Sequence, residues 1–278
     1  MKFHRLWLIP LVCLPLLCVG CSGGGRIFGE RTLRVMTYNI HHAEGTDQAI
    51  DIKRIAEVIK EADTDIVALQ EVDRLTARSA NTDMITKLAD LTGMTYAFGK
   101  TIDFQGGEYG NGVLTRFPIL QERNIHYQLP SAEPRAVMQL VLDVNGTEIV
   151  LMNTHLDPTT HDSVRVAHVN EIVAAALEYR PRPVVLCGDF NDTTGSECLN
   201  AIAKGFEDCW NAVHATGGAT YPSNSPQKRI DYVFVSNQQP GTSTGNSQAN
   251  LRPVSARVLQ STASDHLPLV VDLHVVSD

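Results

Sequence analysis

The 278-residue chain has few cysteines, only two tryptophans, and no long apolar run after its first twenty residues. Three of its six cysteines fall within the first 21 residues, so Cys187, Cys198 and Cys209 remain for a folded domain. So few thiols exclude a disulfide-dense scaffold, and no spacing matches a zinc site. We expect either a single Cys198–Cys209 disulfide or three reduced, partly buried thiols.

Clusters of Lys and Arg with interleaved aromatic residues are also missing, and the formal net charge is −8. Loss of an N-terminal leader would remove Lys2 and Arg5 but no acid, and would make the charge −10. Because such a surface repels phosphates, we expect no tight binding of duplex DNA. The remaining composition, 43% hydrophobic and 19% charged, is that of a globular protein with a substantial core.

The N-terminus has the features of an export signal. A short basic start precedes the apolar run 6–19, which is too short to span a bilayer. Gly20, Cys21 and a Ser-Gly linker then resemble the processing site of a bacterial lipoprotein. We expect a signal peptide over 1–20 and a flexible linker over 21–32. A lipid on Cys21 would anchor the exported protein to a membrane on the periplasmic or cell-surface side. The alternative is a plain secreted protein.

Apolar periodicity predicts an alternation of strands and helices. Helical spacing predicts three main helices over 48–62, 81–92 and 162–179, and a short helix is expected near 196–204. Strand patterns occupy 33–40, 66–72, 113–119, 135–144, 148–156, 183–190, 229–236, 255–262 and 268–276. Gly110 and Gly112 predict a turn, and Asn145-Gly146 predicts a hairpin. About nine or ten strands with three main helices favour an α+β fold, in which two packed sheets are covered by helices.

Polar side chains recur at the ends of the predicted strands. They are Asn39, Glu71, Asn153, His155, Asp189, Asn191, Asp231, Asp265 and His266. A carboxylate beside buried strands costs several kcal/mol unless it is paired or bound to a metal. A divalent cation would give these acids a common role, and Mg²⁺ prefers oxygen ligands.

The motifs that contain these residues occur in a recognisable order. They read TYNI, DIVALQEVD, GNGVLTRFPI, NTHLD, GDFND, RIDYVF and SDHLPL. In this order the sequence resembles the endonuclease/exonuclease/phosphatase superfamily, which includes DNase I, from about residue 33 to residue 274. The resemblance implies one domain over 33–278 with a DNase I-like four-layer α/β/β/α sandwich. It also implies a Mg²⁺ or Mn²⁺ cofactor and hydrolysis of phosphate esters.

The resemblance further implies three groups of site residues. The side chains that hold the cation or its waters are Asn39, Glu71 and Asp265. The catalytic side chains are His155, Asp189, Asn191, Asp231 and His266. Further phosphate contacts are expected from Tyr109, Asn111 and Arg135. His41 and His42, directly after TYNI, are candidates for the rim of the pocket.

Each implied catalytic role has a chemical reason. Asp189 and Asn191 would orient the attacking water and bind a phosphate oxygen. His266, held by Asp231, would be the general base or stabilise the transition state, and His155 would bind or protonate a phosphoryl oxygen. In-line attack needs a positioned water, a proton acceptor and charge neutralisation at the phosphate. Whether Asp189 or His266 takes the proton stays open at this point.

Structural alternatives exist for single members of the set. Asn39 alone would read as a turn cap, Asp189 as the start of an Asx turn, and Asp231 as a partner of Arg229. The ordered set of motifs favours the functional interpretation over these readings.

Three functions follow from the sequence. The first is an exported, metal-dependent phosphoesterase that acts on a small or lipid-linked phosphodiester or phosphomonoester. The second is a secreted endonuclease of the DNase I type. The third is a non-catalytic surface-binding module on the same sandwich. The oligomeric state is not indicated.

Overall fold

The computed structural model describes residues 32–129, 131–159, 162–237 and 249–277. The predicted signal peptide and the linker up to residue 31, including Cys21, lie outside these residues. Within them, no helix combines the length and apolar character needed to cross a membrane.

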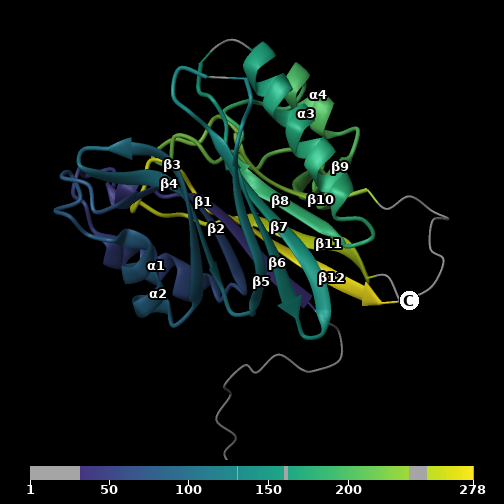
Figure 1. Cartoon of the computed structure of the whole chain (residues 1–278), viewed down its shortest axis with the longest axis horizontal. Helices are drawn as coiled ribbons and strands as arrows, with labels where there is room; N and C mark the ends of the chain where they lie inside the picture. The colour runs from purple at the N-terminus through teal and green to yellow at the C-terminus, as the bar shows by residue number, and fades with distance from the viewer. Residues whose placement is uncertain (1–31, 130, 160–161, 238–248, 278) are drawn as a thin grey trace, which may run out of the picture.

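The strands form two six-stranded sheets that pack face to face (Figure 1). The first sheet has the order β11 (Ala249–Val258), β12 (Leu269–Ser277), β1 (Thr32–Asn39), β2 (Ile66–Arg74), β4 (Gly107–Thr115) and β3 (Thr95–Phe104). The second has the order β5 (Ile119–His126), β6 (Ala136–Val144), β7 (Thr147–His155), β8 (Val184–Asp189), β10 (Asp231–Ser236) and β9 (Phe206–Asp208). Among the strand pairs of the described residues, β1–β2 and β7–β8 are parallel and the others antiparallel.

Helices cover the outer face of each sheet (Figure 1). The first sheet is covered by α1 (Ile52–Ala62) and α2 (Met84–Thr92). The second is covered by α3 (Asp162–Glu178) and α4 (Glu197–Ile202), and the short α5 (Cys209–Val213) contacts β10 and β11. The expected four-layer α/β/β/α sandwich is therefore confirmed.

Local sequence signals set the ends of the first two helices. Asp51 caps α1 by accepting a hydrogen bond from the backbone N–H of Lys53, and Asp83 caps α2 in the same way. Asp63 and Gly93 end these helices in the left-handed conformation, with φ of 49° and 70°. The helices end at Ala62 and Thr92, the last residues of the predicted ranges 48–62 and 81–92.

The central strands are buried on both faces. In β1, Leu33 and Val35 point into the core between the sheets, whereas Met36 and Tyr38 pack under α1 and α2. Strands covered on both sides read as nearly continuous apolar runs. Each fully buried side chain of this size contributes about 1.5–3 kcal/mol to folding.

Two sequence predictions in this part of the chain are wrong. Residues 113–119 are not one strand, because β4 ends at Thr115 and β5 begins at Ile119 in the other sheet. Gly110 and Gly112 do not form a turn but lie inside β4. A Cβ on Gly110 would lie 2.1 Å from the Gly99 carbonyl oxygen, and one on Gly112 would lie 2.8 Å from Cδ1 of Ile85. These glycines permit close packing rather than chain reversal.

The three cysteines of the domain are free and buried. Cys198 packs in the core between the second sheet and its helices, whereas Cys187 and Cys209 pack in the core between the sheets. The second sheet therefore separates Cys198 from Cys209, and the reduced alternative holds in this structure.

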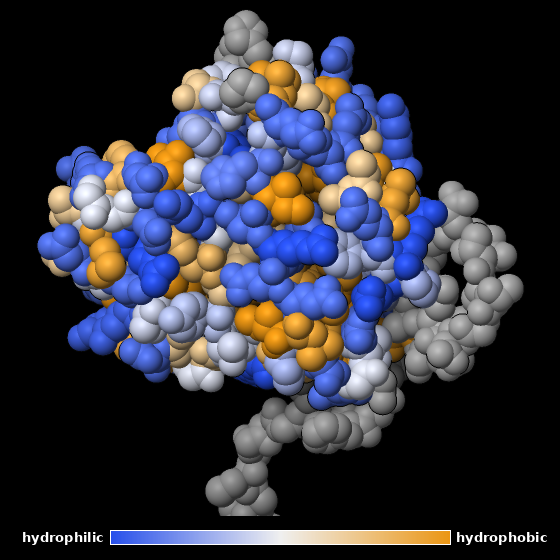
Figure 2. Space-filling model, viewed as in Figure 1, coloured by the Kyte–Doolittle hydropathy of each residue, from blue (hydrophilic) through white to orange (hydrophobic). Residues whose placement is uncertain are grey.

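Hydrophilic side chains predominate on the face drawn in Figure 2, among smaller apolar groups. The edge strand β5 illustrates the mixture, since Leu120 and Ile125 are exposed beside the polar and charged residues Gln121, Glu122 and Arg123. Charged residues on an edge strand disfavour pairing with a second molecule.

Candidate active site

The topology brings the ends of six strands to one side of the sandwich. The parallel pairs β1–β2 and β7–β8 belong to different sheets, and β1 packs on β8 while β2 packs on β7. The C-terminal ends of these four strands therefore lie close together. Antiparallel β10 begins at Asp231, opposite Asp189, and β12 begins just after His266, with Leu269 beside Thr37.

Asp189 lies at the centre of the site and is 1% exposed. Its Oδ1 accepts a hydrogen bond of 2.8 Å from the N–H of Asn191, which forms an Asx turn. Its Oδ2 accepts one of 3.0 Å from Asn39 and lies 3.6 Å and 3.7 Å from Nε2 of His155 and His266. The expected Asx turn and a site-facing oxygen therefore coexist in one carboxylate.

Burial is the main cause that raises the pKa of Asp189, to about 7, and the nearby Asp231 carboxylate adds to it. A carboxyl group with this pKa can exchange a proton near neutral pH.

His266 forms a buried pair with Asp231. Its Nδ1 donates a hydrogen bond of 2.9 Å to Oδ2 of Asp231, which is 0% exposed. Burial alone would lower the pKa of His266, but the charges of Asp231 and Asp189 outweigh it and raise this pKa to about 10. The ring also lies against Tyr221, with 4.8 Å between the ring centroids. His266 is therefore an imidazolium at neutral pH.

His155 is held as a neutral imidazole. Arg135 Nη1 lies 3.1 Å from its Nδ1, and because a guanidinium only donates, this nitrogen must accept. The ring proton is then on Nε2, the atom nearest Asp189. Burial, and secondarily the Arg135 charge, lower the pKa of His155 well below its usual range.

Glu71 reaches the site through a β-bulge. The β2–β4 register shifts between Leu69 and Val72, and Glu71 has a φ of 58°. The Asn39 amide donates hydrogen bonds of 3.0 Å to both Glu71 and Asp189, and its oxygen accepts from the N–H of His41. Asn39 thus bridges two carboxylates, and direct ligation of a cation by its oxygen stays a prediction.

These residues surround a cavity of about 650 Å³. Its walls include the predicted site residues Glu71, Tyr109, Arg135, His155, Asp189, Asn191, Asp265 and His266. Asn39 donates to Glu71 and Asp189, and Asp231 accepts from His266, although neither residue lines the cavity. Asn111 does not line the cavity; its side chain is buried and donates to the Ala136 carbonyl. The structure therefore brings together every predicted catalytic side chain, while Asn111 supports a neighbouring strand.

The sequence profile of the Endonuclease/Exonuclease/phosphatase family matches residues 36–266. The chain belongs to this family. Uncharacterized protein YbhP of Escherichia coli K12 is 26% identical in an alignment of 263 positions that covers 88% of this chain and 97% of YbhP.

Two further relatives widen the comparison. A 5'-tyrosyl-DNA phosphodiesterase of Caenorhabditis elegans is 30% identical over 190 residues, covering 64% of this chain and 47% of that protein. A solved endonuclease/exonuclease/phosphatase structure from Beutenbergia cavernae superposes with a TM-score of 0.69 at 27% identity, covering 88% of this chain and 72% of that one. The family consists of hydrolases that act on phosphoesters.

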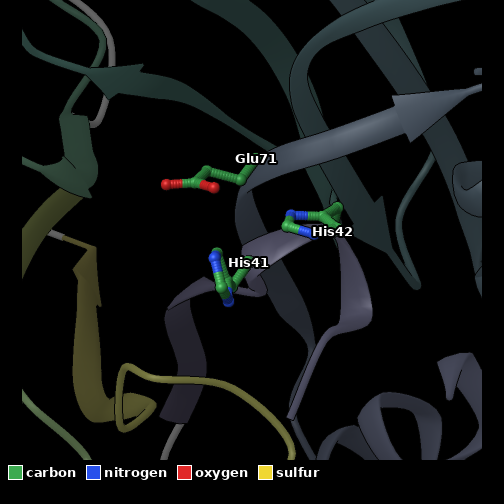
Figure 3. Close-up of side chains that lie close together, drawn as sticks. All are labelled: His41, His42 and Glu71. Carbon is green, nitrogen blue, oxygen red and sulfur yellow. The ribbon is translucent and has the colours of Figure 1, made fainter. Parts of the chain in front are cut away.

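In this member of the endonuclease/exonuclease/phosphatase family, two contacts suggested by the sequence are absent from the described residues: an Asp231–Arg229 pair, and His41 and His42 at the cavity rim. Arg229 pairs with Asp208 at 2.7 Å, so Asp231 is left to His266. His41 and His42 do not line the large cavity but lie beside Glu71 (Figure 3).

Several residues that line the cavity of this family member were not predicted from the sequence. Arg78, Ile102, Phe104, Glu133 and Tyr221 line the cavity from loops and from the unpredicted β3. Each comes from a segment without a strong apolar period. The repeated glycines around β3 and β4 were the available signal, since they mark close packing of backbones.

A polar bridge ties the two sheets together beneath the active site of this family fold. The Asn153 amide donates to the carbonyls of Leu69 and Gly112 at 2.8 Å and 2.9 Å. Gln70 donates to the Asn153 oxygen at 2.7 Å, and both side chains are fully buried. Since Gln70 precedes Glu71 and Asn153 lies two residues before His155, the bridge fixes both ends of the site.

Proposed function

We propose that this chain is an exported, metal-dependent phosphoesterase that uses water to hydrolyse a phosphodiester or phosphomonoester of a small or lipid-linked substrate. One observation carries the proposal. Asp189, the His266–Asp231 pair and the neutral His155 meet at a single cavity that also holds the carboxylates of Glu71 and Asp265. Buried carboxylates and imidazoles cost stability, and clusters of them in a cavity are typical of functional sites.

The donor set fits a hard divalent cation. Glu71 and Asp265 present carboxylate oxygens to the cavity, and the Asp265 side chain is 38% exposed, so water can share the site. Mg²⁺ typically takes one or two carboxylates and keeps several waters, and Mn²⁺ accepts similar ligands. When bound, such a cation neutralises charge on the phosphoryl group and acidifies water.

The pKa order supports separate roles for the titrating side chains. His266, with a pKa of about 10, is protonated at neutral pH and serves to stabilise negative charge on phosphoryl oxygens. Asp189, with a pKa of about 7, is suited to orient the attacking water and accept its proton. His155 carries its proton on Nε2 and donates it in a hydrogen bond to a phosphoryl oxygen.

The rest of the cavity favours a small organic phosphate. Its volume lies within the range that suits a small-molecule ligand. Ile102, Phe104 and Tyr109 offer apolar contact to an organic group, while Arg135 and the exposed Lys228 provide cations near it. The net charge of −8 disfavours a long polyanion such as duplex DNA.

A phosphoester panel tests this proposal. The purified protein would be assayed on phospholipid, sugar-phosphate and aryl phosphodiesters and phosphomonoesters with Mg²⁺, Mn²⁺ or Ca²⁺, and with a chelator. We expect turnover of at least one class, abolished by the chelator and reduced at least about 100-fold in His266→Ala. His126→Ala, an exposed histidine on β5, is the matched control.

The same assay separates the competing functions. Nicking of plasmid DNA at low salt, without turnover of small phosphoesters, would instead identify a nuclease of the DNase I type. Absence of any phosphoester turnover with all three cations would leave a non-catalytic binding module.

Export and lipid attachment need a separate experiment. The full chain and Cys21→Ala would be expressed in a bacterial host and partitioned in detergent. We expect the unaltered protein in the detergent phase and the variant in the aqueous phase. Equal aqueous partition of both proteins would support a plain secreted form.

A further inference from the structure

Two adjacent histidines stand beside Glu71 in an unusual stretch of backbone. His41 and His42 form the 3₁₀ helix η1 (His41–Ala43), directly after β1. His41, His42 and Glu71 all have positive φ, at 44°, 42° and 58°. Residues other than glycine rarely adopt this conformation, and it occurs preferentially where a side chain must be aimed at a functional position.

The three side chains converge on one another. One ligand atom from each lies within 4.8 Å of the other two. Figure 3 shows the Glu71 carboxylate above both imidazole rings, with the rings coming from η1 and the carboxylate from the bulge within β2. The rings of His41 and His42 meet edge to face, with 4.5 Å between their centroids.

The hydrogen bonds of the rings leave one nitrogen of each imidazole available. Nδ1 of His41 lies 3.3 Å from the backbone oxygen of Glu44, and Nε2 of His42 lies 3.3 Å from the Glu44 carboxylate. Nδ1 of His42 is buried and has no hydrogen-bond partner among the described residues, in a side chain that is only 8% exposed. A buried polar atom without a partner calls for an explanation such as an ion.

We propose that His41, His42 and Glu71 form a transition-metal site, which shares Glu71 with the oxygen-rich cation site of the proposed function. Imidazole nitrogens favour Zn²⁺ and other later transition ions over Mg²⁺. Histidine ligands usually hold their second ring nitrogen against a carboxylate or a backbone carbonyl, which is the arrangement that Glu44 provides here. Three protein ligands leave room for water or a further group, as in open zinc sites.

The site has a regulatory consequence through Glu71. An ion held by the two histidines draws on the carboxylate that the proposed function assigns to its own cation. An excess of Zn²⁺ therefore inhibits Mg²⁺-supported turnover. This consequence rests on the proposed function, whereas binding of the ion to the histidines does not.

Titration of the metal-stripped full-length protein with Co²⁺, a coloured substitute for Zn²⁺, tests the site. We expect visible absorption bands from one bound ion, and at least about tenfold weaker binding in both His41→Gln and His42→Gln. His126→Gln is the matched control and should bind Co²⁺ as the unaltered chain does. If buried His42 cannot be replaced without unfolding, the half-exposed His41 carries the test.

Two results would overturn the inference. One is unchanged Co²⁺ affinity in a folded His41→Gln protein. The other is loss of affinity in His266→Gln while both His41 and His42 variants keep it, since the ion would then belong to the cluster of Asp189, Asp231 and His266. The measurement uses no substrate, so a failed phosphoester panel would leave it unaffected.

Discussion

His266 Nδ1 lies 2.9 Å from Oδ2 of Asp231, and the two side chains come from segments that are 35 residues apart. Asp231 Oδ1 has no hydrogen-bond partner in the described parts of the chain. The carboxylate therefore directs its charge at the imidazole. This pairing keeps His266 cationic at neutral pH and makes Asp231 a positioning residue.

Removal of the Asp231 charge should move the alkaline limit of activity. His266 is protonated below its pKa of about 10, so turnover that needs the cation falls as the pH rises through that value. In Asp231→Asn the pKa of His266 should fall by about 1–3 units, and the pH at which activity declines should fall with it. The check is the pH dependence of kcat/KM, with exposed Asp90→Asn as control. If activity declines at the same alkaline pH in the folded variant, this role for Asp231 is excluded.

Arg135 should control the tautomer of His155. Without its donor, Nδ1 of His155 is free to carry the proton, and loss of the nearby charge raises the pKa of His155. We expect Arg135→Gln to protonate His155 at higher pH than the unaltered chain and to lower kcat about 100-fold. Nitrogen NMR shifts of the histidine rings report both changes. If His155 keeps its proton on Nε2 in the variant, the inferred control by Arg135 is wrong.

The Asn153 bridge should contribute to stability rather than chemistry. Asn153→Leu removes the 2.7 Å acceptor of the buried Gln70 amide and the donor to the Leu69 and Gly112 carbonyls, which costs about 1–3 kcal/mol. Urea unfolding measures the loss. Asn200→Leu, at an exposed position on α4, should change the free energy of unfolding by no more than about 0.5 kcal/mol. Equal stability of the two variants would contradict the bridge.

The protonation of Asp272 should make the free energy of unfolding depend on pH. Burial favours its neutral form, but hydrogen bonds from Arg34 and Ser255 outweigh burial and lower the pKa of Asp272. A lowered folded-state pKa adds stability above the unfolded value of about 3.9, and this stability is lost as the pH falls through the folded value.

Asp272→Asn should therefore be less stable by about 1–3 kcal/mol at pH 7, with the gap closing in acid. Unfolding free energies of both proteins between pH 7 and pH 2 give the comparison. A gap that stays constant with pH would point to packing instead of charge.

The ordered motifs of the sequence predicted the fold and a set of residues that the structure brings to one cavity, because strand ends in a sandwich place distant residues together. Asp189 and His266 could be assigned to one site in this way. The resemblance also implied that Asp231 holds His266, and the structure contains that pair, whereas the residues alone left Arg229 as an alternative partner of Asp231. Arg229 directly precedes the segment of Asp231 and was a reasonable partner, but the register of β10 turns Asp231 toward His266.

Segments rich in glycine were the least predictable. Gly110 and Gly112 have the composition of a turn, yet close contact with Gly99 and Ile85 places them in a strand. The site walls contributed by β3, including Phe104, were missed for the same reason. Contacts between backbones far apart in the chain leave no period in the sequence.

The Asn153 bridge also bears on how the protein would lose activity. Glu71 lies in the first sheet and Asp265 in the loop before its strand β12, while His155, Asp189 and Asp231 lie in the second sheet. A slip of one sheet over the other by a fraction of a residue would separate these groups while leaving every strand intact. Turnover would therefore depend on the alignment of the two sheets. On heating, it would be lost before circular dichroism detected any loss of secondary structure.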